Sequence, residues 1–322
     1  PVSMANMREV SKYCRRNGIR VVLDAARVLE NCYFIKKREQ GYSNKSLKDI
    51  CRELCSYTDA CTMSAKKDAY VNIGGWLAMN EEKFFVEAKN LVVVFEGLHT
   101  YGGMAGRDME AVARGFKEAA ENEEIINWRI RQVEYLGHNC MQADIPVVRP
   151  IGGHAVFVDA KAFFPHIPQE QYPAQRLAAE LYIESGVRSM ERGIVSAGRD
   201  HATGQNRFPK LELVRLTIPR RAYTNSHMDV VVESLRRVWK RRNEVKGLKF
   251  KFEPRDLRYV ARRQGVLRPE RSELLLAERA AVKRRVDAQR ADAHGPPHGR
   301  RQAEMPGDPA VFPLARRGND IR

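Results

Sequence analysis

The chain has 322 residues, of which 43% are apolar and 30% are charged, and its formal net charge is +16. This composition is typical of a globular protein with about two domains, and no apolar run is long enough to cross a membrane. The six cysteines lack the paired spacing of zinc fingers. We therefore expect reduced thiols in a cytoplasmic protein.

A positive balance of this size also occurs in proteins that bind nucleic acid. Residues 261–322 carry +6 of the charge, and the other basic residues are spread along the chain rather than arranged in a stripe. The sequence contains no helix-turn-helix, RNA-recognition or zinc-finger signature. We expect the charge to serve an anionic ligand and solubility, and a basic nucleic-acid-binding protein is kept as an alternative.

The first part of the chain alternates helical and strand patterns, as α/β proteins do. We expect helices at 5–17, 27–36, 46–55 and 81–89, a strand at 19–24 and a buried apolar run at 91–95. The strand ends at Asp24, and open α/β sheets bind ligands beyond the carboxyl ends of their parallel strands. A carboxylate there can keep a pyridine nitrogen protonated, and it can equally cap the next helix.

A second motif, Ser64-Ala65-Lys66-Lys67-Asp68, lies where a strand passes into a loop, with Asn72-Ile73-Gly74-Gly75 close behind. A buried lysine amine can form a Schiff base with an aldehyde, and a serine hydroxyl can bind a phosphate. The motif therefore suggests a pyridoxal phosphate lysine. Paired lysines are more often part of a solvated loop, so the motif alone does not decide between the two.

The second half continues with helical spacing from Asp108 to about Met141. We expect one long helix here, which carries the chain from the first domain to the second. Beyond it we expect a strand, a Gly-Gly turn and a strand over 146–159, a helix at 172–185, a strand at 212–218 and a helix at 227–242.

In this order, the motifs resemble the β-eliminating lyases, the tyrosine phenol-lyase and tryptophanase family of aminotransferase-like pyridoxal phosphate enzymes. The resemblance covers about the first 260 residues. It is carried by the stretches Pro1–Met7, Asp24–Arg27, Ser64–Asp68, Tyr101–Gly103, Gly152–Phe157 and Val214–Arg221. It implies an α/β fold of fold type I, with an incomplete large domain at 1–120, a small α+β domain with its linking helix at 121–260, and a basic tail outside the family at 261–322.

The cofactor residues are carried over from matching family motifs. The resemblance implies that Lys67 forms the Schiff base with pyridoxal 5'-phosphate and moves the α-proton of the substrate. It also implies that Ser64 and Lys66 bind the phosphate. Asp24 would keep the pyridine nitrogen protonated, and Arg27 would hold the ring oxygen.

The substrate residues are implied in the same way. Arg215 would bind the substrate carboxylate, Arg192 would bind a phenolic oxygen, and His154 would line the cleft. The backbone carbonyl of Asn72 would help to bind a potassium ion.

Within the family, three stretches look like tyrosine phenol-lyases: Ser189–Gly193, Gly106–Glu110 and the pair Arg220-Arg221. The implied reaction converts L-tyrosine and water to phenol, pyruvate and ammonia. Tryptophanases carry an apolar residue in place of Arg192, and tryptophanase activity is the alternative within the family.

The resemblance begins in the middle of the family's large domain, so we expect an N-terminally truncated lyase. The family's phosphate-binding Gln-Gly-Arg loop, the aromatic residue that stacks on the cofactor and the tyrosine that protonates the leaving group all lie upstream of Pro1. We expect the complete protein to be a homotetramer and the chain by itself to be poorly folded and inactive. A non-catalytic remnant is a further alternative.

Residues 261–322 contain 13 arginines and one lysine and are rich in alanine, proline and glycine. Apart from helical potential near 273–289, we expect this segment to be disordered. A shifted reading frame in GC-rich DNA is one explanation, and a genuine basic tail is the other. The DNA sequence around the codon for Val260 distinguishes them.

Overall fold

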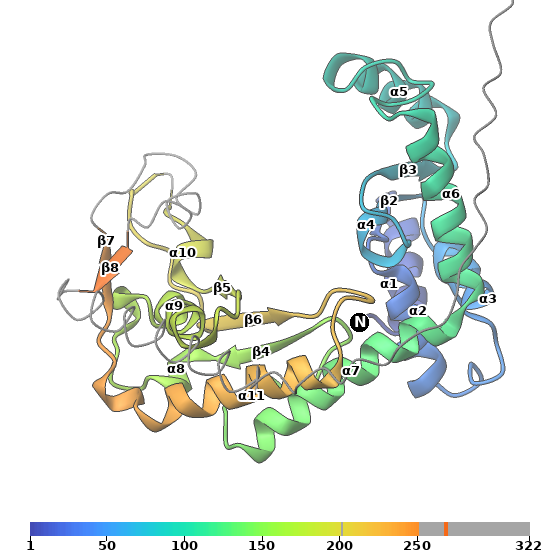
Figure 1. Cartoon of the computed structure of the whole chain (residues 1–322). Coiled ribbons are helices and arrows are strands. Elements are labelled where there is room, and N and C mark those ends of the chain that lie inside the picture. Colours follow the sequence, from blue (N-terminus) through green and yellow to red (C-terminus); the bar gives the residue numbers. More distant parts are fainter. Residues whose placement is uncertain (201, 251–266, 270–322) are drawn as a thin grey trace, which may run out of the picture. The chain divides into compact units, whose positions relative to one another are not determined.

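The structure is a computed structural model and describes residues 1–200, 202–250 and 267–269. By their contacts, all of these residues belong to one unit, Pro1–Ser272. Helices and strands alternate along it, which confirms the predicted α/β class (Figure 1). None of the helices in these residues has the length and apolar character needed to cross a membrane.

The first sheet contains β1 (Val22–Asp24), β2 (Ala60–Ser64) and β3 (Gly75–Met79), in that order among the described residues. Strands β1 and β2 are parallel, with Asp24 opposite Thr62, and β3 is antiparallel to β2. The carboxyl ends of β1 and β2 therefore lie at the same edge of the sheet. As a result, the segments that follow Asp24 and Ser64 start next to each other.

Three helices contribute to the core beside this sheet: α1 (Met4–Arg16), α2 (Val28–Arg38) and α3 (Leu47–Ser56). In α3 the buried residues are Leu47, Ile50 and Leu54, which recur every three or four positions on one face. Ser46 caps this helix, because its hydroxyl accepts the N–H of Asp49 at 3.1 Å. The three helices begin and end within two residues of the predicted limits.

Glu53 links α3 to α1 and to the loop between α2 and α3. Its carboxylate accepts hydrogen bonds from Arg8, from the Tyr42 hydroxyl at 2.7 Å and from Lys45 at 2.9 Å. Burial opposes ionisation of Glu53, but the hydrogen bonds from Lys45, Tyr42 and Arg8 outweigh it and lower its pKa to about 2.

We expect Glu53→Gln to destabilise the chain by about 1 kcal/mol at pH 7, because the hydrogen bonds that stabilise the ionised carboxylate are made only in the folded state. A lowered pKa stabilises the fold above the ordinary glutamate value of 4.5. The contribution is lost as the pH falls from there towards about 2. Urea denaturation of both proteins at pH 7 and pH 3 measures this. A difference in stability that stays constant with pH would contradict it.

Helix α4 (Ala65–Asp68) is a single turn after β2, and α5 (Glu82–Phe95) follows β3. The predicted buried run at 91–95 is wrong, because these residues continue α5 and several are exposed. Val94 is 72% exposed and Phe95 is 76% exposed within the described chain. Consecutive apolar residues point to all sides of a helix, and a short apolar run does not by itself distinguish a helix from a strand.

The single long helix predicted from 108 to 141 is instead two helices, α6 (Gly106–Glu121) and α7 (Glu123–Gln142). Asn122, with ψ of 88°, separates them. Asparagine is a poor residue for a helix interior, and Glu123 and Glu124 favour the start of a new helix. The apolar period continues across the break, so the sequence pattern did not reveal it.

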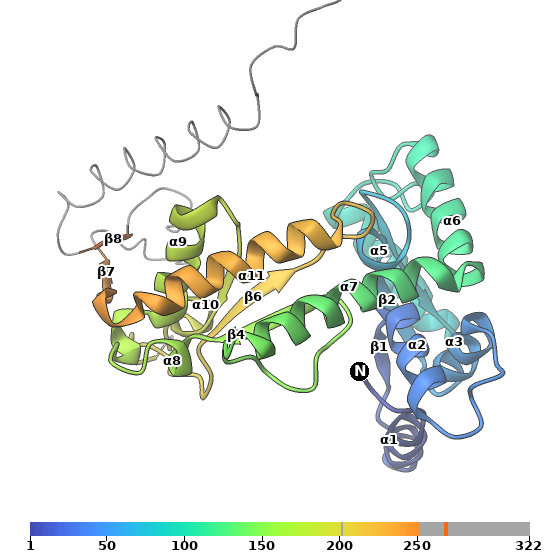
Figure 2. The same ribbon diagram turned by 60° about the horizontal axis from the view of Figure 1, so that its bottom comes forward.

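Helix α7 joins the two large hydrophobic cores of the described chain. Ile126 and Ile130 in its first half belong to the core around β2, whereas Val133, Leu136 and Cys140 belong to the second core. Helix α11 (Asn225–Lys240) packs along α7, as Figures 1 and 2 show. Helix α7 alone therefore contributes to both cores, and the predicted division into two domains stays a prediction.

The second sheet contains β4 (Ala155–Asp159), β6 (Leu213–Thr217) and β5 (Met190–Arg192), and its described strands are antiparallel neighbours in that order. The predicted first strand of 146–159 is reduced to one bridge, Val147 to Val158. Only the second strand extends far enough to pair along β6.

The remaining elements surround the second sheet or follow α11. They are α8 (Ala160–Phe163), η1 (Gln169–Gln171), α9 (Pro173–Ser185), α10 (Ile194–Ala197), η2 (Arg242–Glu244), β7 (Leu248–Phe250) and β8 (Leu267–Pro269). Strands β7 and β8 are antiparallel. Strand β8 falls within the predicted tail, and the other residues of 261–322 lie outside the described residues.

Candidate functional site

A pocket of about 450 Å³ lies beside the end of β1, helix α2 and the start of β4. Its volume is in the range of small-molecule sites. Among its lining residues are Asp24 and Arg27 at the β1–α2 turn, Glu30 from α2, His154 just before β4 and Phe157 within it. The structure thus brings three predicted site residues to one pocket: Asp24 and Arg27 from one turn, and His154 from a distant part of the sequence.

Asp24 shapes the turn that leads into α2. Its Oδ1 accepts the backbone N–H of Ala26 at 3.0 Å, whereas α2 begins at Val28 with Arg27 as its N-cap residue. The interpretation of Asp24 as the cap of this helix is therefore wrong. The short turn instead points the exposed Asp24 and the half-buried Arg27 to the pocket.

The lysine motif follows the neighbouring strand. Ser64 ends β2 and precedes α4, and its side chain makes no capping bond with that helix in the described structure. Lys66 is exposed and Lys67 is half-buried. These residues do not belong to the wall of the 450 Å³ pocket, but they follow the strand adjacent to the one that ends at Asp24.

A buried ionic network connects α2, α4 and α7, and the sequence analysis missed it. Arg129 donates to Glu30, and its Nη2 lies 3.5 Å from Oδ1 of Asp68. The backbone N–H of Glu30 donates to Oδ2 of Asp68 at 3.0 Å. Glu30 also lies 3.2 Å from Nδ1 of His154, which lines the pocket. The network thus joins the lysine helix to a pocket residue.

The two carboxyl groups of this network differ in their ionisation. Burial opposes ionisation of Glu30, but His154 and Arg129 outweigh it and lower its pKa. Burial raises the pKa of Asp68, and Arg129 offsets only part of this effect. A Cβ added at Gly153 would come within 2.7 Å of the Glu30 carboxyl carbon, so a glycine is required beside the network.

The sequence signal for this network was a charged residue inside an apolar stripe. Glu30 lies among the buried residues of α2, and Arg129 lies between Ile126 and Val133 on the buried face of α7. Charged side chains are rarely fully buried unless they are paired. Such positions indicate an ion pair, but they do not identify the partner.

The second sheet has one face in the core and one that carries predicted substrate residues. Core residues on β4 and β6 alternate with residues of the other face. Arg215 lies opposite Phe157 on one side and Met190 on the other, so the three share a face. Arg192, two residues after Met190, lies on that face too. Phe157 on this face lines the pocket, whereas Met190, Arg192 and Arg215 are not among the residues that line it.

Arg215 lies in a positively charged environment. Burial lowers its pKa, and the guanidinium groups of Arg192 and Arg27 lower it further. Its Nη2 lies 2.9 Å from the Met190 sulfur, and its buried Nε has no hydrogen-bond partner in the described residues. Three neighbouring arginines, one of which has an unpaired N–H donor, are suited to bind an anion.

Asn72 is exposed in the segment between α4 and β3. The structure does not bring it to the pocket lined by Asp24 and His154. The potassium site predicted at its carbonyl therefore stays a prediction.

The chain matches the family model described as "Beta-eliminating lyase" over residues 1–234. It is 60% identical to the tyrosine phenol-lyase of Symbiobacterium sp. (strain SC-1) over 263 residues, which are 82% of this chain and 57% of the relative. The enzyme of the same name from Clostridium tetani is 60% identical over 259 residues, or 80% of this chain and 56% of the relative.

The chain thus spans a little over half the length of these curated relatives. A solved structure of Leishmania major threonine aldolase is 14% identical, with a TM-score of 0.44 over 74% of this chain and 57% of that chain. The match to the family model extends from before α1 through most of α11 and includes all the site residues discussed above. The chain belongs to the beta-eliminating lyase family.

Proposed function

We propose that the protein converts L-tyrosine and water to phenol, pyruvate and ammonia, with pyridoxal 5'-phosphate as its cofactor. The observation that carries this proposal is the sheet face that Arg192 and Arg215 share with the pocket residue Phe157, in a chain 60% identical to tyrosine phenol-lyases. The relatives are longer than this chain, so the proposal concerns the activity of a complete lyase.

The residues at the carboxyl ends of β1 and β2 fit the chemical groups of the cofactor. Ser64 has a hydroxyl that is not used to cap α4 in the described structure, and Lys66 adds a positive charge beside it, which suits a phosphate. Asp24 supplies a carboxylate for a protonated pyridine nitrogen. Arg27 supplies a guanidinium for the ring oxygen, and both of these residues line the pocket.

Pyridoxal phosphate, when bound, withdraws electrons from the Cα of an amino acid that is joined to it. Lys67 would hold the cofactor by its Nζ and then accept the proton from Cα. Arg215 would orient the substrate by binding its carboxylate with two parallel hydrogen bonds. Arg192, on the same face of the sheet, would hold the phenolic oxygen at the other end of the substrate.

Two further properties are proposed on the resemblance alone. The Asn72 carbonyl would contribute to a potassium site, and the complete protein would be a homotetramer. Potassium titration of cofactor binding tests the first, and sedimentation analysis of the complete protein tests the second.

The proposed reaction is tested with a chimeric protein. This chain is joined to the part of the Symbiobacterium enzyme that has no counterpart in it, and the product is assayed beside the chain alone. We expect phenol and pyruvate in equal amounts from L-tyrosine, and no indole from L-tryptophan. Indole release would favour the tryptophanase alternative. A chimera that binds the cofactor but releases neither product would contradict the proposal.

We expect Arg192→Val to lower kcat/KM for L-tyrosine in this chimera by about 10- to 100-fold, because a hydrogen bond from a charged donor is lost. Release of a small leaving group from the same amino-acid backbone, such as chloride from β-chloroalanine, should change little. Arg188→Val is the matched control, since Arg188 is exposed just before the same strand. Equal losses with both substrates would mean that Arg192 does not act on the phenol ring.

A further inference from the structure

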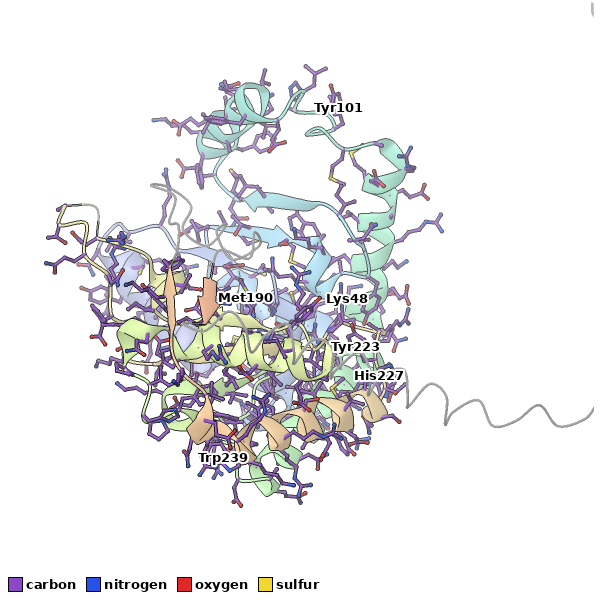
Figure 3. The ribbon with its side chains drawn as sticks, turned by 60° about the vertical axis from the view of Figure 1, so that its left-hand side comes forward. Lys48, Tyr101, Met190, Tyr223, His227 and Trp239 are labelled. Atoms are coloured by element: carbon purple, nitrogen blue, oxygen red, sulfur yellow. The ribbon has the colours of Figure 1, made fainter. Side chains whose placement is uncertain are left out.

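The turn between β6 and α11 touches the helix that carries the lysine pair. Nη2 of Arg220 donates to the backbone carbonyl of Lys66 at 3.1 Å, across 154 residues of sequence. The guanidinium also lies 5.3 Å from the ring centroid of Tyr70. The same turn is held on its other side by α7, where the Gln132 side chain donates to the carbonyl of Tyr223 at 2.6 Å. Tyr223 and His227, labelled in Figure 3, mark the passage from this turn into α11.

The carbonyl of Lys66 accepts from Arg220 because its ordinary helical partner is used elsewhere. In a longer helix it would accept the N–H of Tyr70, four residues on. That N–H instead donates to the carbonyl of Gly115 on α6 at 3.3 Å. Helix α4 therefore ends after one turn, and its Lys66 peptide is held by a side chain from another part of the chain.

Arg220 is also part of the charged surroundings of the buried network. Burial lowers its pKa, and Arg129 lowers it further, whereas the charge of Asp68 acts in the opposite direction. Its Nη1 is buried and has no hydrogen-bond partner in the described residues. Burying a charged guanidinium with an unpaired nitrogen is unfavourable. A half-buried arginine of this kind therefore indicates a fixed structural contact rather than a contribution to solubility.

The position of Arg220 in the sequence connects this contact to the substrate site. It follows Arg215 by five residues, and β6 ends at Thr217 between them. The strand that carries Arg215 is therefore fastened, through Arg220, to the peptide that immediately precedes Lys67.

We infer that Arg220 is a positioning residue that sets the distance between Lys67 and Arg215. It holds the lysine turn against the end of β6, so that the amine and the carboxylate-binding guanidinium meet the two ends of one α-amino acid backbone. The chemical meaning of this distance rests on the proposed function, whereas the contact itself does not.

Arg221 is a matched neighbour without this contact. Its guanidinium lies 5.2 Å from the centroid of the Tyr70 ring, nearly the same distance as that of Arg220. Its side chain is 56% exposed, and its ion pair is with Glu118 at 3.6 Å. Removing Arg221 takes away the same charge beside Tyr70 and leaves the bond to Lys66 in place.

The contact is tested first on the chain without cofactor, by hydrogen–deuterium exchange. We expect Arg220→Met to speed amide exchange about tenfold in residues 65–70 and 213–219, because both segments lose their common anchor. Arg221→Met should leave both segments unchanged. Equal exchange in the two variants would overturn the inference, whether or not the chain binds pyridoxal phosphate.

The role towards Lys67 is tested by absorbance and by conservative replacement. Arg220→Met should weaken the lysine-dependent band formed with pyridoxal phosphate about tenfold in affinity, and Arg220→Lys should recover most of it, since its ammonium can still donate to the carbonyl. Circular dichroism identifies a variant that has unfolded. If Arg220→Lys folds but resembles Arg220→Met, the positioning role is wrong. A wild-type chain without a band would mean that this part of the enzyme does not hold the cofactor by itself, and the exchange result still decides on Arg220.

Discussion

Replacing Lys67 by alanine is expected to abolish the visible absorbance band that pyridoxal phosphate forms when it is added to the purified chain. Such a band requires a covalent link between the aldehyde and an amine held at the site. Lys67 is half-buried on α4, the single turn that directly follows β2. Absorbance titration of the wild-type chain and the variant measures the loss.

The neighbouring Lys66 provides the matched control. It is exposed, and we expect Lys66→Ala to keep the band while weakening cofactor affinity about tenfold, as for one charge-assisted hydrogen bond to phosphate. If the band survives in Lys67→Ala and disappears in Lys66→Ala, the assignment of the two lysines is reversed. If both variants retain it, the cofactor lysine lies elsewhere.

Arg129→Met is expected to cause the largest loss of stability among single replacements in the described chain. Its side chain and those of Glu30 and Asp68 are almost completely buried. Removal of the cation leaves two carboxyl groups without their shared partner, and breaking a buried ion pair costs roughly 3–5 kcal/mol. The loss should be measured as the free energy of unfolding in urea at pH 7.

The pH dependence follows from the sign of the Glu30 shift. Arg129 helps to lower the Glu30 pKa, so its contribution is present at neutral pH and is lost as acid protonates the carboxyl group. The difference in the free energy of unfolding between Arg129→Met and the wild-type chain should therefore become smaller below about pH 4. Adding Glu30→Gln and Asp68→Asn to the variant should recover part of the stability.

Arg131→Met is the control for this prediction. Arg131 lies two residues further along α7 and is exposed, so its replacement should change stability by less than about 0.5 kcal/mol. If the two replacements destabilise the chain equally, the buried network contributes no more to stability than an exposed arginine of the same helix does.

Much of the local structure could be predicted from the sequence. The β-branched run before Asp24 and the capping Ser46 are local signals: α3 is where Ser46 indicates, and β1 keeps Val22–Asp24 of the strand predicted at 19–24. The structure has the parallel pair of strands, β1 and β2, on which the predicted ligand roles of Asp24 and Ser64 depend, and the roles themselves stay predictions. The break at Asn122 was not predictable from periodicity, because the apolar stripe of α6 continues in register into α7.

The sequence by itself therefore determined most of the elements, the motif order and the family resemblance, since these depend on short windows of residues and on their identity. Only the tertiary structure decided that Arg129 pairs with Glu30 across 99 residues, and that Arg192 and Arg215 share a sheet face. The physical reason is that a buried charge requires a partner but does not specify one in sequence. The partner is selected by how the helices and strands pack, and the same packing brings Arg220 to the lysine turn.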